Sequence, residues 1–221
     1  GEQGRVARAG GRAPGRGVVL LDEPFSSLDE NLRARVRTDT LALLREAGSA
    51  AVLVTHDQTE ALALGDRVAV MRDGVLEQVA SPAEVYESPV NRFVASFMGE
   101  ADFLPAHVRD ALLTSEIGVV STVPGWGGTD LDVEVMLRPH EVALAVDPDA
   151  AARVVAVEYH GAFVLHTVRL ASGATLRSWQ QHGVRHPVGT PVAVSGMPGA
   201  RPVLLAGEVA LAAPPEAARR P

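Results

Sequence analysis

Two short apolar runs, separated by one helix-length segment, constrain the fold of the first part of this chain more than any other feature. Val18–Leu21 runs into Asp22-Glu23-Pro24, and Ala50–Thr55 runs into His56-Asp57. Runs of this kind are typical of strands that are buried on both faces of a parallel sheet. Ligands of open α/β sheets bind at the carboxyl ends of such strands, so these polar residues mark a candidate site.

The segment between the two runs has helix signals at both ends. Ser27-Leu28-Asp29-Glu30 has the form of a capping box, apolar residues follow it at helical spacing, and Gly48 is a stop signal. A short second helix is expected over Gln58–Leu64. The order strand, helix, strand, helix predicts a right-handed parallel unit.

The pattern changes after residue 66. Two strand-like segments flank Asp73-Gly74, a strong hairpin signal, and helices are expected over Pro82–Tyr86 and Asn91–Met98. Short strands separated by Gly and Pro turns follow, which predicts a small barrel or sandwich. We therefore divide the chain into an α/β domain over 1–100 and an all-β domain over 101–221.

Composition excludes several classes of function. All 20 residues of the Lys and Arg count are arginine, so the chain contains neither a Schiff-base lysine nor the phosphate-binding lysine of a P-loop. The net charge of −7 argues against nucleic acid as a partner. The absence of cysteine, of a signal peptide and of a long apolar span makes the cytoplasm the expected location.

The carboxylate pair and the histidine have both plain and catalytic interpretations. Asp22 and Glu23 could simply begin a surface loop, and a histidine at a strand end is often only a polar surface residue. However, Val18–Pro24 has the four apolar residues and the acid of a Walker B strand, followed by a second acid. Nucleotide hydrolysis uses one carboxylate for Mg²⁺ and a second to orient or deprotonate the attacking water, roles that suit Asp22 and Glu23 respectively.

Together with Ser26–Asp29 and the stretch Val54–Ala61 around His56, this segment resembles the ATPase subunits of ABC transporters, in which Walker B, D-loop and switch-histidine motifs follow in this order. The resemblance implies a partial P-loop NTPase with a parallel sheet, and ATP and Mg²⁺ as cofactors. It gives catalytic roles to Glu23 and to His56, which would contact the γ-phosphate, and makes Asp22 the Mg²⁺ ligand.

The same resemblance places nucleotide contacts elsewhere in the chain. Gly1 and Glu2 fall on the last two residues of the family's signature motif, which faces the nucleotide held mainly by a partner subunit. Ser27 and Asp29 lie on the D-loop, and Asp29 would act across the same interface. The resemblance thus implies a dimer of ATPase subunits.

The C-terminal part resembles the TOBE domain, an OB-like barrel, of importer ATPases of the maltose, sulfate, ferric-iron and polyamine group. The stretch Leu137–Val142 resembles a motif of that domain, and Phe93–Glu100 resembles the exit of the nucleotide domain in the same importer group. The resemblance implies a subunit that couples ATP hydrolysis to solute uptake through permease subunits and, indirectly, an extracytoplasmic solute-binding protein. It would lie peripherally on the inner face of the cell membrane, and ferric iron or sulfate is the favoured cargo.

A Walker A loop is missing, so the family resemblance implies an N-terminally truncated subunit. Without a lysine, the chain alone is expected neither to bind ATP with normal affinity nor to hydrolyse it. The alternative is a catalytically dead fragment that serves as a regulatory or assembly module. Reading the DNA upstream for an in-frame Walker A loop distinguishes the two.

The other histidines give no pattern of metal ligands. His182 and His186 are four residues apart, but Gly183 and Pro187 argue against a helix that would place them on one face. The remaining four are expected to be surface or half-buried residues: His107, His140, His160 and His166. Trp126 and Trp179 are expected to serve in packing.

Overall fold

The computed structural model describes residues 17–26 and 28–212. They form two compact units, of which the first holds the described residues up to Val70 together with Val79–Ala83. The second holds Met71–Gln78 and the described residues from Glu84 onward. The division of the chain at residue 100 stays a prediction. No helix within the described ranges is both long enough and apolar enough to cross a membrane.

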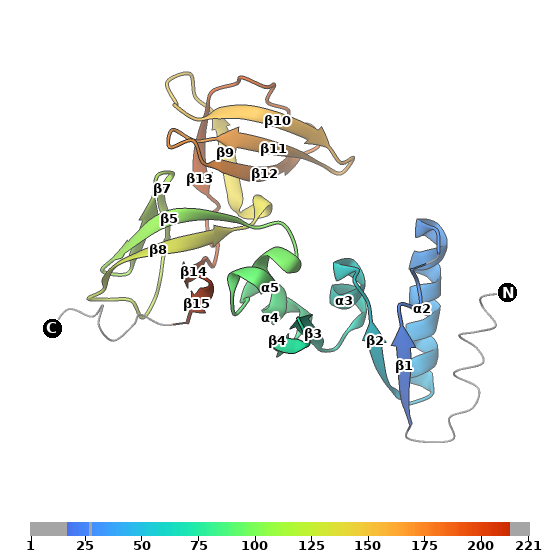
Figure 1. Cartoon of the computed structure of the whole chain (residues 1–221). Helices are drawn as coiled ribbons and strands as arrows, with labels where there is room; N and C mark the ends of the chain where they lie inside the picture. The colour runs from blue at the N-terminus through green and yellow to red at the C-terminus, as the bar shows by residue number, and fades with distance from the viewer. Residues whose placement is uncertain (1–16, 27, 213–221) are drawn as a thin grey trace. The chain divides into compact units, whose positions relative to one another are not determined.

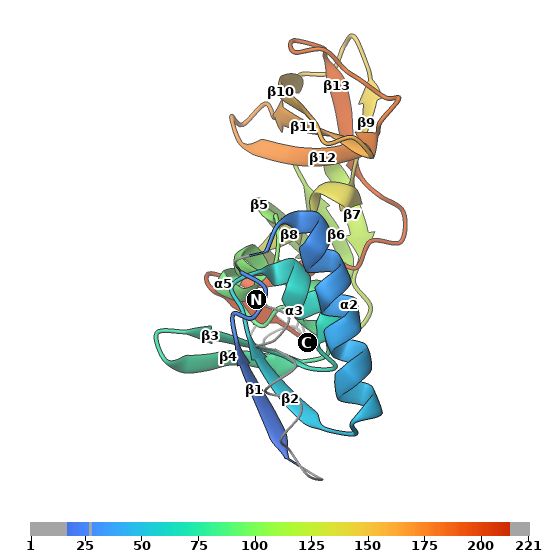
Figure 2. The same ribbon diagram turned by 90° about the vertical axis from the view of Figure 1, so that its right-hand side faces the viewer.

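The first unit has the predicted order of elements. Strands β1 (Val18–Asp22) and β2 (Ala50–Val54) pair in parallel, connected by helix α2 (Glu30–Glu46) and followed by helix α3 (Gln58–Leu64). In two views turned by 90°, α2 runs beside both strands (Figures 1 and 2). The parallel pairing therefore brings the carboxyl ends of β1 and β2 to the same edge of the sheet.

The start of α2 differs from the predicted capping box. The N-cap is Asp29, whose carboxylate accepts a 3.0 Å hydrogen bond from the Leu32 amide, so the helix begins two residues later than a Ser27 cap requires. An Asp side chain is a favoured N-cap, and its charge also interacts well with the positive end of the helix dipole, so the helix starts after Asp29. Ser27 itself lies outside the described residues. The predicted stop is confirmed, since Gly48 follows the C-cap with φ +59°.

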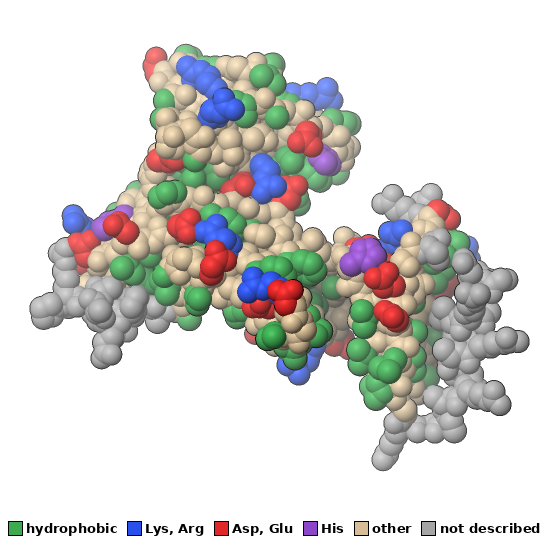
Figure 3. Space-filling model, viewed as in Figure 1, with side chains coloured by type: hydrophobic (Ala, Val, Ile, Leu, Met, Phe, Trp, Pro, Cys, Tyr) green, Lys and Arg blue, Asp and Glu red, His purple; other side chains and the backbone are tan. Residues whose placement is uncertain are grey.

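One face of the β1–β2 sheet is exposed, contrary to the prediction that both strands are buried on both faces. Val18, Leu20, Val52 and Val54 are 62%, 75%, 51% and 55% exposed. The register pairs Leu20 with Val52, so these side chains share one face. Figure 3 shows hydrophobic side chains at the surface over these two strands. Within the described residues, α2 covers one face of the sheet and no second layer covers the other.

The structure confirms the predicted Asp73-Gly74 hairpin and the two short helices after it. Strands β3 (Val68–Arg72) and β4 (Val75–Ala80) pair through Asp73 and Gly74, whose φ angles of +51° and +80° are those of a primed turn. Helices α4 (Pro82–Glu87) and α5 (Arg92–Phe97) follow.

The second unit is rich in short strands, as predicted for the TOBE-like part. One sheet has the order β15-β14-β8-β5-β6-β7, a second the order β10-β11-β12, and β13 pairs with β9. The strands are β5 (Asp102–Arg109), β6 (Leu112–Ser115), β7 (Gly118–Thr122), β8 (Asp130–Leu137), β9 (Val142–Val146), β10 (Arg153–Tyr159), β11 (Phe163–Arg169), β12 (Thr175–Gln181), β13 (Val192–Gly196), β14 (Val203–Ala206) and β15 (Val209–Leu211).

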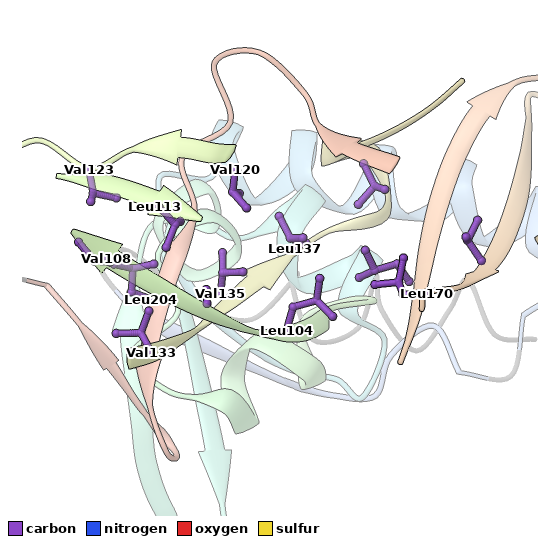
Figure 4. Packing of buried hydrophobic residues seen from close by; sticks show 14 of the residues in the cluster. Leu104, Val108, Leu113, Val120, Val123, Val133, Val135, Leu137, Leu170 and Leu204 are labelled. Carbon is purple, nitrogen blue, oxygen red and sulfur yellow. The ribbon is translucent and has the colours of Figure 1, made fainter. Parts of the chain in front are cut away.

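Alternating inward side chains of these strands build the core of the second unit (Figure 4). Leu104 and Val108 of β5 and Val135 of β8 are fully buried in it. Trp126, in the turn before β8, is 4% exposed and belongs to the same cluster, which confirms its packing role. Burial of this many large apolar side chains, at about 1.5–3 kcal/mol each, is the main source of stability of this unit.

Arg138 ties the two short helices to the end of β8. Its side chain is 2% exposed, and its guanidinium donates to the carbonyls of Tyr86 (2.8 Å), Ala95 (3.2 Å) and Glu100 (3.1 Å). The guanidinium carbon also lies 3.8 Å from the centre of the Tyr86 ring. A Cβ atom on Gly99 would lie 3.2 Å from the Tyr86 ring and 3.3 Å from the Arg138 guanidinium, so any side chain at position 99 would crowd both groups. We call Arg138 and the three carbonyls that it binds the Arg138 clamp. Arg138, within the stretch that resembles a TOBE motif, therefore has a structural role.

His166 departs from the expectation of a surface or half-buried residue, because it is fully buried. It lies on β11, the middle strand of its sheet, and its Nε2 accepts a 3.0 Å hydrogen bond from the His186 amide. Burial, together with the charge of His186, lowers the pKa of His166 below its ordinary value. The folded protein therefore favours the neutral ring.

This burial predicts that acid destabilises the second unit. Below a pH of about 6.5 the unfolded chain takes up a proton on this imidazole, whereas the folded protein resists it, so stability falls as the pH falls. The melting temperature measured from pH 8 to pH 5 should fall less steeply in the His166→Gln variant, which keeps a hydrogen-bond acceptor and does not titrate. Parallel curves for the two proteins would refute this role for His166.

Candidate functional site

The site lies where β1 and β2 end. Asp22 is the last residue of β1 and pairs with Val54 in the parallel register. Glu23 follows with a left-handed φ of +42°, and its amide donates a 2.9 Å hydrogen bond to the Val54 carbonyl. A positive φ is uncommon for a residue other than glycine and often marks a functional position. This turn directs the Glu23 side chain toward the end of β2.

Glu23 and His56 meet at this edge. The Glu23 Oε1 and His56 Nδ1 atoms are 3.0 Å apart, although 33 positions separate the residues in the sequence. Both side chains are accessible, with exposures of 46% and 73%. The hydrogen bond with Glu23 raises the pKa of His56, and the charges of Glu23, Asp57 and Glu60 add to this effect. The pair thus favours a carboxylate facing an imidazolium.

The residue after His56 fixes the start of α3. Asp57 is the N-cap, and its Oδ1 accepts a 3.1 Å hydrogen bond from the Glu60 amide. Partial burial by itself would raise the pKa of Asp57, but the amide hydrogen bonds of Glu60 and Thr59 and the charge of Arg37 outweigh it, so the pKa is lowered. Asp57 is therefore a carboxylate near neutral pH.

The predicted site residues divide into three groups. Glu23 and His56 are in contact, and Asp22 adjoins Glu23 at the same strand end. Asp29 lies at the start of α2, where its carboxylate caps the helix. The remaining three predicted contacts lie outside the described residues: Gly1, Glu2 and Ser27.

The recess at this site is small. Its volume is about 50 Å³, and Glu23, His56, Asp57 and Arg33 are among the residues that line it. A nucleotide needs a cleft several times larger. A second recess of about 220 Å³, beside Trp126 in the second unit, is lined by no acid or histidine and offers no group for the same chemistry. The described residues therefore do not enclose a space of nucleotide size at this recess.

Sequence reasoning missed three residues that surround His56. Arg37 on α2, Thr55 at the end of β2 and Glu60 on α3 form hydrogen bonds with one another or with Asp57. Glu60 is 3% exposed, which is unusual for a carboxylate. The spacing of Arg33 and Arg37, four residues apart on a helix, places both on one face and was the available signal.

Residues 135–204 match the model of the TOBE domain family. The chain is 42% identical over 171 residues to the Fe(3+) ions import ATP-binding protein FbpC 1 of Rhodococcus jostii, covering 77% of this chain and 49% of that protein. It is 36% identical over 217 residues to the spermidine/putrescine import ATP-binding protein PotA of Marinobacter nauticus, covering 90% of this chain and 58% of the relative.

A third relative is the sulfate/thiosulfate import ATP-binding protein CysA 2 of Chromobacterium violaceum, with 50% identity over 109 residues, or 49% of this chain and 30% of that protein. The chain spans about half the length of the first relatives it matches. The three relatives named above are import ATP-binding proteins, and the TOBE match falls in the strand-rich second unit. The chain therefore belongs to the family of ABC-importer ATP-binding subunits that carry a TOBE domain.

Proposed function

We propose that this chain supplies the part of an ATP site that binds Mg²⁺ and the attacking water in the ATPase subunit of an ABC importer, a partial P-loop NTPase unit. One observation carries the proposal: the 3.0 Å contact between Glu23 and His56, brought together by two parallel strands. An acid paired with a histidine, both accessible, is suited to proton transfer at a bound substrate.

Each residue has a distinct role in this proposal. Asp22 would hold Mg²⁺, which when bound neutralises charge on the phosphates. A Mg²⁺ ion in a phosphate site is usually held by one or two carboxylates together with phosphate oxygens, a role that a single Asp22 carboxylate can fill. Glu23 orients the attacking water and accepts its proton, and the protonated ring of His56 donates to the γ-phosphate.

The phosphate-binding lysine has to come from outside these residues, because the 221 residues contain none. Gly1, Glu2, Ser27 and Asp29 would contact the nucleotide across a dimer of ATPase subunits. The partners in this proposal are that second subunit, the permease subunits on the inner face of the membrane and, indirectly, a solute-binding protein. Two of the relatives above import Fe(3+) and sulfate/thiosulfate, so we propose an inorganic ion as the cargo.

The absence of lysine also favours a second candidate, a regulatory or assembly module that does not hydrolyse ATP. This module would act through the strand-rich second unit. The two candidates differ in one property, which is whether the Glu23–His56 edge can complete a working ATP site.

A hybrid protein tests the proposal. The part of the Rhodococcus jostii relative that precedes its counterpart of Val18 is joined to residues 18–221 of this chain, and phosphate release from ATP is measured. We expect Mg²⁺-dependent turnover by the hybrid and none by the 221-residue chain. A folded hybrid that binds ATP without turnover would instead support the regulatory module.

A further inference from the structure

Arg37 connects helix α2 to the junction that carries His56. Its Nη2 donates to Asp57 Oδ2 at 2.9 Å and to Glu60 Oε1 at 2.6 Å, and its Nε lies 3.2 Å from the same Glu60 oxygen. The Arg37 side chain is 15% exposed and that of Glu60 is 4% exposed. Ion pairs so shielded from water are screened much less than surface pairs, and truncation of one partner leaves a buried charge.

The network closes around His56. Thr55 Oγ1 donates to Glu60 Oε2 at 2.6 Å and accepts from the Asp57 amide at 3.0 Å. Asp57 Oδ1 accepts in turn from the Glu60 amide. The residues on both sides of His56 are thus fixed to groups that Arg37 holds, while the His56 ring itself is 73% exposed. A ring so exposed keeps one orientation only if its backbone is fixed.

We propose that Arg37 is a positioning residue for the Glu23–His56 pair, because its guanidinium holds Asp57 directly and Thr55 through Glu60, and so keeps the His56 ring against the Glu23 carboxylate. The catalytic use of the pair rests on the proposed function, but the positioning itself does not. A lysine at position 37 keeps the charge and loses the planar fork, so it cannot bridge Asp57 and Glu60 in the same way.

The rival explanation is that Arg37 acts only through its charge. When the Arg37 side chain is removed, the two explanations predict opposite changes in the pKa of His56. The charged groups around His56 are Glu23, Asp57 and Glu60, with Arg33 and Arg37 on α2. Loss of the Arg37 charge alone leaves Asp57 and Glu60 uncompensated, which raises the pKa of His56 further. Loss of positioning separates the ring from Glu23, the main cause of the raised pKa, so the pKa falls.

The test is an NMR titration of the histidine rings in the complete 221-residue chain, with the His56 signal assigned by its loss in His56→Gln. In Arg37→Lys and in Thr55→Val, which removes a hydroxyl of the network without any change in charge, we expect the pKa of His56 to fall toward its ordinary value. Arg35→Met, which removes an exposed arginine from the same helix, is the matched control and should leave it unchanged.

An unchanged His56 pKa in both network variants would overturn the proposal, as would a rise in Arg37→Met. No nucleotide is present in this experiment. A failure of the proposed ATPase activity would therefore leave its result unaffected, and a failure of positioning would show here even if the hybrid hydrolyses ATP.

Discussion

ATP turnover by the hybrid protein falls about 10²- to 10⁴-fold when Glu23 is replaced by Gln, the range typical of a lost general base. The amide keeps the size of the side chain and its place at the strand end but cannot accept a proton from water. ATP binding, measured by equilibrium dialysis with Mg²⁺ present, should change little because Asp22 is intact. Phosphate release at saturating ATP is the measurement.

The matched control is Glu46→Gln in the same hybrid. Glu46 is an exposed acid in the last turn of α2, so this variant removes the same charge away from the strand ends. It should keep turnover within about twofold, as is usual for surface substitutions. If Glu23→Gln loses no more turnover than this control, Glu23 has no role in activating water.

Replacing Arg138 with Met lowers the stability of the second unit by about 3 kcal/mol, since buried carbonyls left without a donor cost about 1–3 kcal/mol each. Methionine retains apolar contact with the Tyr86 ring but offers no donor to the carbonyls of Tyr86, Ala95 and Glu100. For a domain of this size the midpoint of thermal unfolding should fall by roughly 6 to 12 °C. Calorimetry of the 221-residue chain measures this.

Arg169→Met is the control for this prediction, because Arg169 is an exposed arginine at the end of β11 in the same unit. It should change stability by no more than about 0.5 kcal/mol. A midpoint of thermal unfolding for Arg138→Met within about 2 °C of that of the control corresponds to less than about 1 kcal/mol for a domain of this size. Such a result would mean that the three carbonyls find other donors and that Arg138 does not hold these segments together.

Local signals were sufficient for much of the fold. Strands β1 and β2, both helices beside them, the Asp73-Gly74 hairpin and the strand-rich second unit all follow from hydrophobic period, caps and turn residues. The meeting of Glu23 and His56 could also be anticipated, because a parallel pair places the ends of both strands at one edge.

The start of α2 is a local feature that was misplaced, because the capping-box pattern points to Ser27 whereas the Asp29 carboxylate accepts the hydrogen bond from the Leu32 amide. Other features depended on tertiary contacts. Burial of His166 reflects its place on a middle strand, and that order of strands cannot be read from local periodicity. Likewise Arg37 and Glu60, 23 residues apart, pair only because α2 and α3 pack together.

The central claim is that Glu23 and His56 act on ATP as one unit, and a double-mutant cycle on the turnover of the hybrid tests it most directly. Turnover is measured for Glu23→Gln, His56→Ala and the double variant. If the two residues act together, the double variant loses about as much activity as the more damaged single variant. Losses that multiply in the double variant would show independent action and contradict the account.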